Sequence, residues 1–360
     1  MNATAKATND YARHIFQPLL LVAKGGFACQ ALLLLRAQLY MELGFLPPSL
    51  RCFAIDFVAD APLAPRALFP EIPSDVWERV EFSPAEMYLL KTNIDLKKIA
   101  QRIRRGDADV AWLGRIIPAD VLERYTGTEA CQIPNMTRFF LAYWASAFHR
   151  FDTPWPERLR EHLRALRRNG DALHALTAFG IPPSAVAPTP SRAVSICGAG
   201  GGTGSGASIA VSTILKWLAG QLGLDFKLDA LVITGHYRQR NGHEMRKDAL
   251  AHALDMDITA SVASDAVTEF QLGPDTTARV SGKLFDTLQR LEAYGRYEYQ
   301  TRGMLSAAAR FLRYTYFTRA GYQQQKDVAN DDVYPALRTL SVTPSSGRAA
   351  LLGQRPFRED

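Results

Sequence analysis

The sequence has few cysteines, and they are scattered. Its four cysteines form no Cys-x-x-Cys pair and have no Cys/His spacing suited to zinc. This pattern excludes a zinc module, which needs its ligands grouped at short, regular spacings. Scattered free cysteines are typical of a reducing compartment, so we expect a cytoplasmic protein.

Long hydrophobic runs are also absent. The apolar run 16–22 contains Pro18, and Lys24 and two glycines follow it without a cleavage pattern, which excludes a signal peptide. No apolar stretch approaches the roughly 20 residues that a transmembrane helix needs. We therefore expect no membrane span.

No dense block of one charge occurs. The chain has 42 Lys and Arg against 36 Asp and Glu, and no run of five basic residues. The densest basic segments have the spacing of solvated helix faces, so we expect no nucleic-acid partner. The small positive excess favours only weak attraction to phosphates or acidic surfaces.

Short apolar runs alternate with helical patterns along much of the chain. Its 360 residues are 47% hydrophobic, which is enough for a sizeable core. Strands are predicted at 19–22, 51–56, 193–197 and 230–234. Helices are predicted at 29–43, 85–105, 137–148, 205–222, 244–254 and 303–320, with a proline-rich loop at 59–84. This alternation predicts an α/β fold in which helices sandwich a mostly parallel, Rossmann-like sheet.

A glycine-rich segment joins the predicted strand 193–197 to the helix that follows. Residues 195–206 read SICGAGGGTGSG, and six of these twelve residues are glycine. Such a turn exposes consecutive amide groups at the positive end of a helix dipole, where phosphate oxygens bind. Thr203 and Ser205 add hydroxyl donors. The alternative is a turn that only lets the strand and the helix approach closely.

Two common phosphate motifs fit this segment poorly. A P-loop needs a lysine directly after the glycines, but the next lysine is Lys216, so a P-loop is excluded. The dinucleotide fingerprint would run over 198–204 as GxGxxxG. It also needs an acid at the end of the next strand, and that strand ends in Thr234 and Gly235. An NAD(P)-dependent oxidoreductase remains the alternative function.

The segment 200–206, GGGTGSG, resembles the signature phosphate loop of the tubulin and FtsZ superfamily, especially its divergent bacterial tubulin-like members. The first turn, AKGGFA at 23–28, is similar to the family's GxGGxG loop, with alanine in place of both outer glycines. Asp56 matches the family's acidic position at the end of the second strand. The resemblance implies a GTPase-type domain that takes GTP or GDP, with Mg²⁺ as the accompanying ion.

The resemblance also implies which residues contact the nucleotide. Asn241 and Glu244 would lie near the ribose, and Asp248 would accept hydrogen bonds from the guanine edge. The complete implied site is Gly25, Gly26, Asp56, Gly200, Gly201, Gly202, Thr203, Gly204, Ser205, Gly206, Asn241, Glu244 and Asp248. We expect Lys24, in the first turn, to face solvent.

Two departures from the family pattern bear on activity. The family's next phosphate loop corresponds to 128–132, where Glu129 places a negative charge near the nucleotide. The family's downstream GxxNxDxxD loop, whose acids activate water, is absent from the sequence. We expect slow or absent GTP hydrolysis, with the missing acids supplied by self-association or a tubulin-like partner. A non-catalytic partner protein that has lost nucleotide binding is a third reading.

The pattern predicts three regions. Residues 1–290 form the nucleotide-binding domain, with 151–191 as an insertion or peripheral helices. Residues 291–326 form a long core helix, and 327–360 form a tail or a remnant of a second domain, so we expect no complete second domain.

Overall fold

The computed structural model describes residues 17–57, 64–125, 133–146, 153–168, 191–237, 242–295, 297–318 and 338–342. Within these residues, seven strands form one sheet in the order β3-β2-β1-β4-β5-β8-β9, and every pairing in it is parallel. The strands are β1 (Leu19–Lys24), β2 (Leu50–Asp56), β3 (Met87–Leu89), β4 (Ser191–Gly198), β5 (Phe226–Tyr237), β8 (Thr287–Gly295) and β9 (Arg338–Val342). The predicted α/β fold with a parallel sheet is confirmed.

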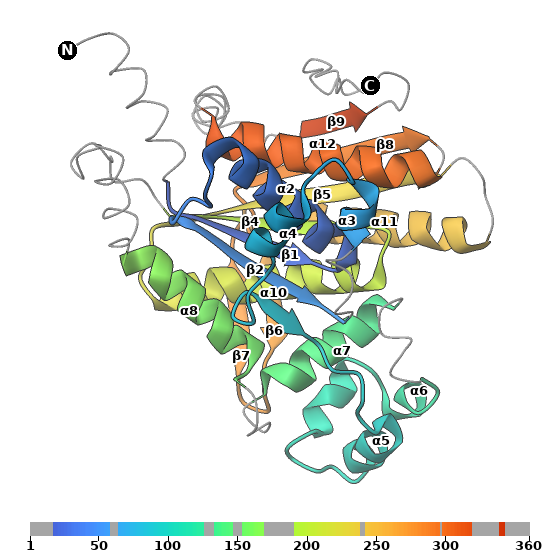
Figure 1. The fold of residues 1–360 in the computed structure, drawn as a ribbon. Helices are drawn as coiled ribbons and strands as arrows, with labels where there is room; N and C mark the ends of the chain where they lie inside the picture. The colour runs from blue at the N-terminus through green and yellow to red at the C-terminus, as the bar shows by residue number, and fades with distance from the viewer. Residues whose placement is uncertain are drawn as a thin grey trace, which may run out of the picture.

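Helices cover both faces of this sheet (Figure 1). One face carries α2 (Gly26–Leu43), α3 (Ala64–Leu68), α4 (Ser74–Val80) and α12 (Tyr297–Phe317). The other carries α7 (Pro134–Ala145), α8 (Trp155–Arg168), α10 (Gly202–Gln221), α11 (Gly242–Ser261) and the antiparallel hairpin of β6 (Val267–Gln271) and β7 (Thr277–Ser281). The short elements α5 (Leu96–Arg104), η2 (Ala111–Arg115) and α6 (Ala119–Leu122) pack beyond α7.

The central strands are apolar throughout because both of their faces are buried. In β1, Leu20 and Val22 belong to the core on the α10 side, whereas Leu21 and Ala23 belong to the core on the α2 side. All four side chains are fully buried. A continuous apolar run is the expected pattern for a strand covered on both faces of a parallel sheet.

The strand order reverses between β1 and β4, which are hydrogen-bonded neighbours. From β1 the chain continues outward to β2 and β3, and from β4 it continues the other way to β5 and β8. The connecting helices α2 and α10 therefore leave the sheet on opposite faces. In open α/β sheets, ligands bind beside the carboxyl ends of the strands at this topological switch point.

Three local predictions differ from the structure. The single helix expected at 85–105 is instead the short strand β3 followed by α5, which starts after Asp95. The Asp95 side chain accepts a hydrogen bond from Lys98 N at 2.9 Å and so caps α5. The expected loop at 59–84 contains α3 and α4. Within 151–191, α8 buries four apolar side chains in the core, so this helix is not peripheral; they are Trp155, Leu159, Leu163 and Leu166.

Candidate functional site

The two glycine turns meet at the carboxyl ends of β1 and β4. Gly25 is the N-cap of α2 and has a φ of +80°, a conformation that favours glycine. A Cβ atom on Gly25 would lie 2.9 Å from the backbone nitrogen of Gly204, in the first turn of α10. Any side chain at Gly25 would therefore collide with α10, and the amino ends of the two helices lie in direct contact.

Both helices begin with amide groups that have no hydrogen-bond acceptor in the described part of the chain. The first backbone bonds run from Ser205 N to Gly201 O at 3.0 Å in α10 and from Cys29 N to Gly25 O at 3.1 Å in α2. The amides of residues 202–204 and 26–28 precede these bonds and have no described partner. Two positive helix ends thus meet at the switch point with unused donors.

The glycines of the GGGTGSG segment divide into two groups. A Cβ on Gly204 would lie 2.3 Å from Gly198 O, and one on Gly206 would lie 2.4 Å from Pro134 O. Close packing of α10 against β4 and α7 therefore accounts for these two glycines. At Gly201, which is exposed, an added Cβ would meet no atom within 4 Å. Close packing does not account for Gly201, so this position is available to a ligand.

The two hydroxyls of the segment are not free donors at the surface. The Ser205 hydroxyl donates to Gly201 O, and the Thr203 side chain hydrogen-bonds to Asp56. Both side chains are buried. In this structure each side chain makes a contact within the protein that shapes the turn. Their contacts with a nucleotide stay a prediction.

Asp56 lies at the carboxyl end of β2 and is joined to the second glycine turn through Thr203. Its carboxylate is 3% exposed and accepts a hydrogen bond from Phe57 N at 2.8 Å. Burial raises the pKa of Asp56 to about 6, although the hydrogen bonds from Phe57 and Thr203 oppose this rise. The structure thus places Asp56 beside the turns, and its contact with a nucleotide stays a prediction.

Lys24 is fully buried, so the prediction that it faces solvent is wrong. Its side chain runs between the sheet and α10, where the amine donates to the Ser195 hydroxyl, to Ser208 O at 3.4 Å and to the Ser212 hydroxyl at 3.5 Å. The two hydroxyls also bond to each other at 2.8 Å. Small residues on β4 and α10 leave room for the lysine, which the sequence of β1 alone did not indicate.

The buried amine of Lys24 has no acidic partner among the residues that the structure describes. Among the described residues, no carboxylate lies within ion-pair distance of Lys24, and its hydrogen-bond acceptors are two hydroxyls and one carbonyl. Burial lowers the pKa of Lys24 to about 8, with an opposing contribution from Cys197. Below that pH, a positive charge therefore lies one residue before the first glycine turn, and no described carboxylate is paired with it.

The base and ribose contacts implied by the resemblance are untested. Asn241 and Glu129 lie outside the described residues. Glu244 and Asp248 belong to α11, which packs against α10 and β5, but their side chains are not described. Their roles in binding the nucleotide stay predictions.

Comparison of the chain with protein-family models, with curated proteins and with solved structures finds no match. Within the described residues, no group of three His, Cys, Asp or Glu side chains is arranged to hold a metal ion. The same residues include no helix that combines the length and the apolar character needed to cross a membrane.

Proposed function

We propose that this chain binds a guanine nucleotide, GTP or GDP, at the carboxyl ends of β1 and β4. One observation carries the proposal: two helix amino ends, whose first amides have no acceptor among the described residues, meet at the topological switch point of a parallel sheet. Phosphate is the ligand group that best matches converging backbone amides and helix dipoles. The buried charge of Lys24 adds to the attraction for an anion.

The phosphates would lie over the exposed part of the second turn. Gly200 and Gly201 are not buried, and the space beside Gly201 is open. Amides 202–204 would donate to the phosphate oxygens from α10, and the amide of Gly26 would donate from α2. The choice of guanine depends on the resemblance of GGGTGSG to the tubulin and FtsZ loop, with Asp248 as the proposed partner of the base.

Asp56 is the described carboxylate beside both turns and would hold the Mg²⁺ ion that accompanies the nucleotide. Mg²⁺ commonly takes one or two protein carboxylates and completes its shell with phosphate oxygens and water. One carboxylate is therefore sufficient if the phosphates contribute the other ligands. Because the family's water-activating acids are absent from the sequence, we propose slow or no hydrolysis by this chain alone.

The second candidate is an NAD(P)-dependent oxidoreductase that uses the same turns. The strand order β3-β2-β1-β4-β5 favours it, because this is the order around the dinucleotide site of Rossmann folds. A pyrophosphate would make the same amide contacts as the β-phosphate of a nucleoside triphosphate. The two candidates therefore differ in the rest of the ligand.

Thermal unfolding with GTP, ATP or NADH tests the proposal, since a ligand that binds only the folded state raises the melting temperature. The Gly201→Leu variant should lose the stabilisation, because a bulky side chain fills the open space beside the turn. Gly220→Leu is the matched control: Gly220 is also exposed with open space around it, but lies at the other end of α10. Stabilisation by NADH alone supports the second candidate, and no stabilisation by any of the three contradicts both.

A further inference from the structure

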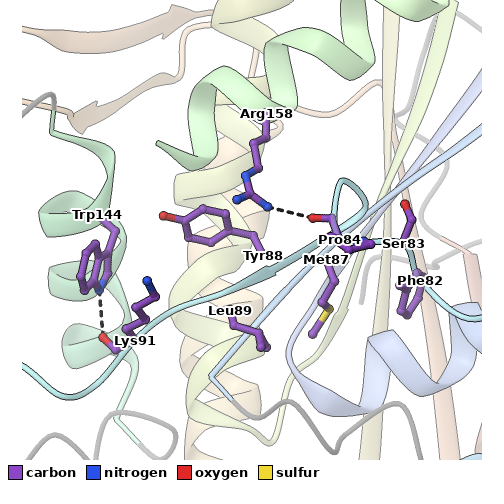
Figure 2. Close-up of a pocket in the computed structure, with 9 residues that line it drawn as sticks. All are labelled: Phe82, Ser83, Pro84, Met87, Tyr88, Leu89, Lys91, Trp144 and Arg158. Carbon is purple, nitrogen blue, oxygen red and sulfur yellow. Dashed lines mark hydrogen bonds between the residues drawn. The ribbon is translucent and has the colours of Figure 1, made fainter. Parts of the chain in front are cut away.

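A groove of about 340 Å³ runs along β3, the strand at one edge of the sheet (Figure 2). Its walls are residues 82–84, the strand β3 with Lys91, Trp144 of α7 and Arg158 of α8. This groove is formed by elements other than the two glycine turns. An inference about this groove therefore does not rest on the proposed nucleotide.

The outer side of β3 has backbone groups that no described residue pairs with. Ala54 N donates to Glu86 O at 2.7 Å, and Leu90 N donates to Asp56 O at 2.8 Å, so these groups, directly before and after β3, face β2. Because backbone groups alternate in direction along a parallel strand, those of Met87 and Leu89 point away from β2. Met87 N donates to Ser83 O at 3.1 Å. In the described part of the chain, Leu89 N–H, Leu89 C=O and Met87 C=O have no partner.

The side chains around these groups are apolar, aromatic and basic. Leu89 is a large apolar residue with 37% of its surface exposed. The guanidinium of Arg158 lies 5.1 Å from the centre of the Tyr88 ring and donates to Pro84 O at 2.9 Å (Figure 2). The lining includes two basic side chains, Lys91 and Arg158, and no acidic one. A ligand with carboxylates would complement this charge.

We propose that the groove binds an extended, acidic peptide segment of a partner protein, which adds a strand beside β3. Its backbone would pair with the outward groups of Leu89 and Met87, as in other cases of β-augmentation. Its carboxylates would face Lys91 and Arg158, and its alternate apolar side chains would cover Leu89. A second copy of this chain fits less well, because edge-to-edge pairing would bring the basic side chains of both grooves together without an acid.

Selection from a phage-displayed library of random decapeptides on the wild-type chain tests this proposal. We expect the selected peptides to alternate apolar with acidic residues, and their affinity is then measured by fluorescence anisotropy. Leu89→Pro removes the outward N–H but leaves the bonds to β2, a replacement that edge strands tolerate. It should weaken binding at least about tenfold, whereas Leu89→Val, which keeps the N–H, should bind within about threefold of wild type.

A charge variant gives a second readout. Arg158→Gln should weaken binding by about tenfold, whereas Arg310→Gln, an exposed site on α12 across the sheet, should not change it. If Leu89→Pro does not fold, the peptide is changed instead of the protein. Two versions of a selected peptide are then made, N-methylated at its odd or at its even positions. Only the version that has lost the N–H groups facing β3 should fail to bind. The proposal is overturned if no peptide is enriched, if the peptides lack acids, or if binding survives these changes. Dimerisation through this edge, seen by sedimentation and lost on Leu89→Pro, would assign the groove to a second copy instead.

Discussion

Charge is buried at both ends of the parallel strands, but the two ends differ in how that charge is balanced. At the amino ends, Asp229 of β5 is fully buried and accepts hydrogen bonds from Arg192 and Thr287 at 2.7 Å and from Tyr316 at 2.9 Å. At the carboxyl ends, Lys24 meets no described carboxylate, and the amides that begin α2 and α10 have no described acceptor. The first group is complete within the protein and stabilises the fold. The second has an excess of donors, which is the arrangement expected of an anion site.

The largest expected effect on stability comes from removing Asp229, the acceptor at the amino ends of the strands. Asp229→Ala removes the shared acceptor of Arg192, Thr287 and Tyr316 and leaves a partly buried guanidinium without its counter-charge. The free energy of unfolding, measured by urea denaturation, should fall by about 3 to 5 kcal/mol. Nucleotide-induced stabilisation should persist in any fraction that folds. A loss below about 1 kcal/mol would contradict the structural role of this group.

Lys24→Met should keep or raise the free energy of unfolding, whereas Asp229→Ala lowers it. Methionine fills a similar volume without a buried charge, and the Ser195 and Ser212 hydroxyls keep their mutual bond, so the variant should be at least as stable as wild type at pH 7. Its affinity for GTP should fall, because the buried cation is lost. A variant destabilised by more than about 1 kcal/mol would show that the amine holds the fold together by itself.

The sign of the pH dependence follows from the lowered pKa of Lys24. Between about 8 and the ordinary value of 10.5, the unfolded chain binds a proton that the folded chain does not, so wild-type stability rises with pH in this window relative to Lys24→Met. The difference in free energy of unfolding between Lys24→Met and wild type should therefore decrease by up to roughly 3 kcal/mol over this pH window. A difference that does not change with pH would contradict the burial of the amine.

Within the glycine segment, the stabilities of Gly204→Ala and Gly201→Ala show which of the two glycines is required for packing. The added methyl at Gly204 collides with Gly198 O, so unfolding should require about 2 kcal/mol less than in wild type. At Gly201 the methyl meets open space and φ is −108°, which any residue adopts, so stability should change by less than about 0.5 kcal/mol. Equal losses at both positions would contradict the division of the segment.

Asp56 should give a pH dependence of the opposite sign to that of Lys24. Its raised pKa means that the folded chain holds a proton between the ordinary value of 3.8 and about 6, so stability relative to Asp56→Asn is greatest below pH 4 and falls as pH rises through 6. The difference should change by up to roughly 3 kcal/mol across this window. Without Mg²⁺ the affinity for GTP should increase as pH is lowered through 6. Parallel stability curves for the two proteins would contradict the burial of this carboxylate.

Local sequence patterns predicted the strands and turns that form this site. The run LLLV, the glycines after it and the segment before α10 were sufficient to place β1, β4, both turns and the parallel sheet. Each of these depends on residues close together in sequence. The strand β3 was missed because its three residues pair only with β2, and no local period distinguishes them from the helix expected there.

The contacts that give the site its charge depend on distant residues. Lys24 is buried because serines almost two hundred positions later surround its amine. The Thr203 side chain hydrogen-bonds to Asp56, which lies far from it in the sequence. The glycines of one motif also divide between packing and exposure according to what α7 and β4 place beside them. None of these neighbours is indicated by the spacing of residues along the chain.

The central claim is that the free amides of the two turns bind phosphate, and amide resonances report this directly. Selective ¹⁵N labelling of the 25 glycines, followed by titration with GTP, separates the two ends of α10 in one spectrum. The account predicts that the amide resonances of Gly26, Gly201, Gly202 and Gly204 shift on binding, whereas those of Gly220 and Gly223 do not. GTP bound with the resonances of the turns unmoved, or no shift at any glycine under saturating GTP, would contradict it.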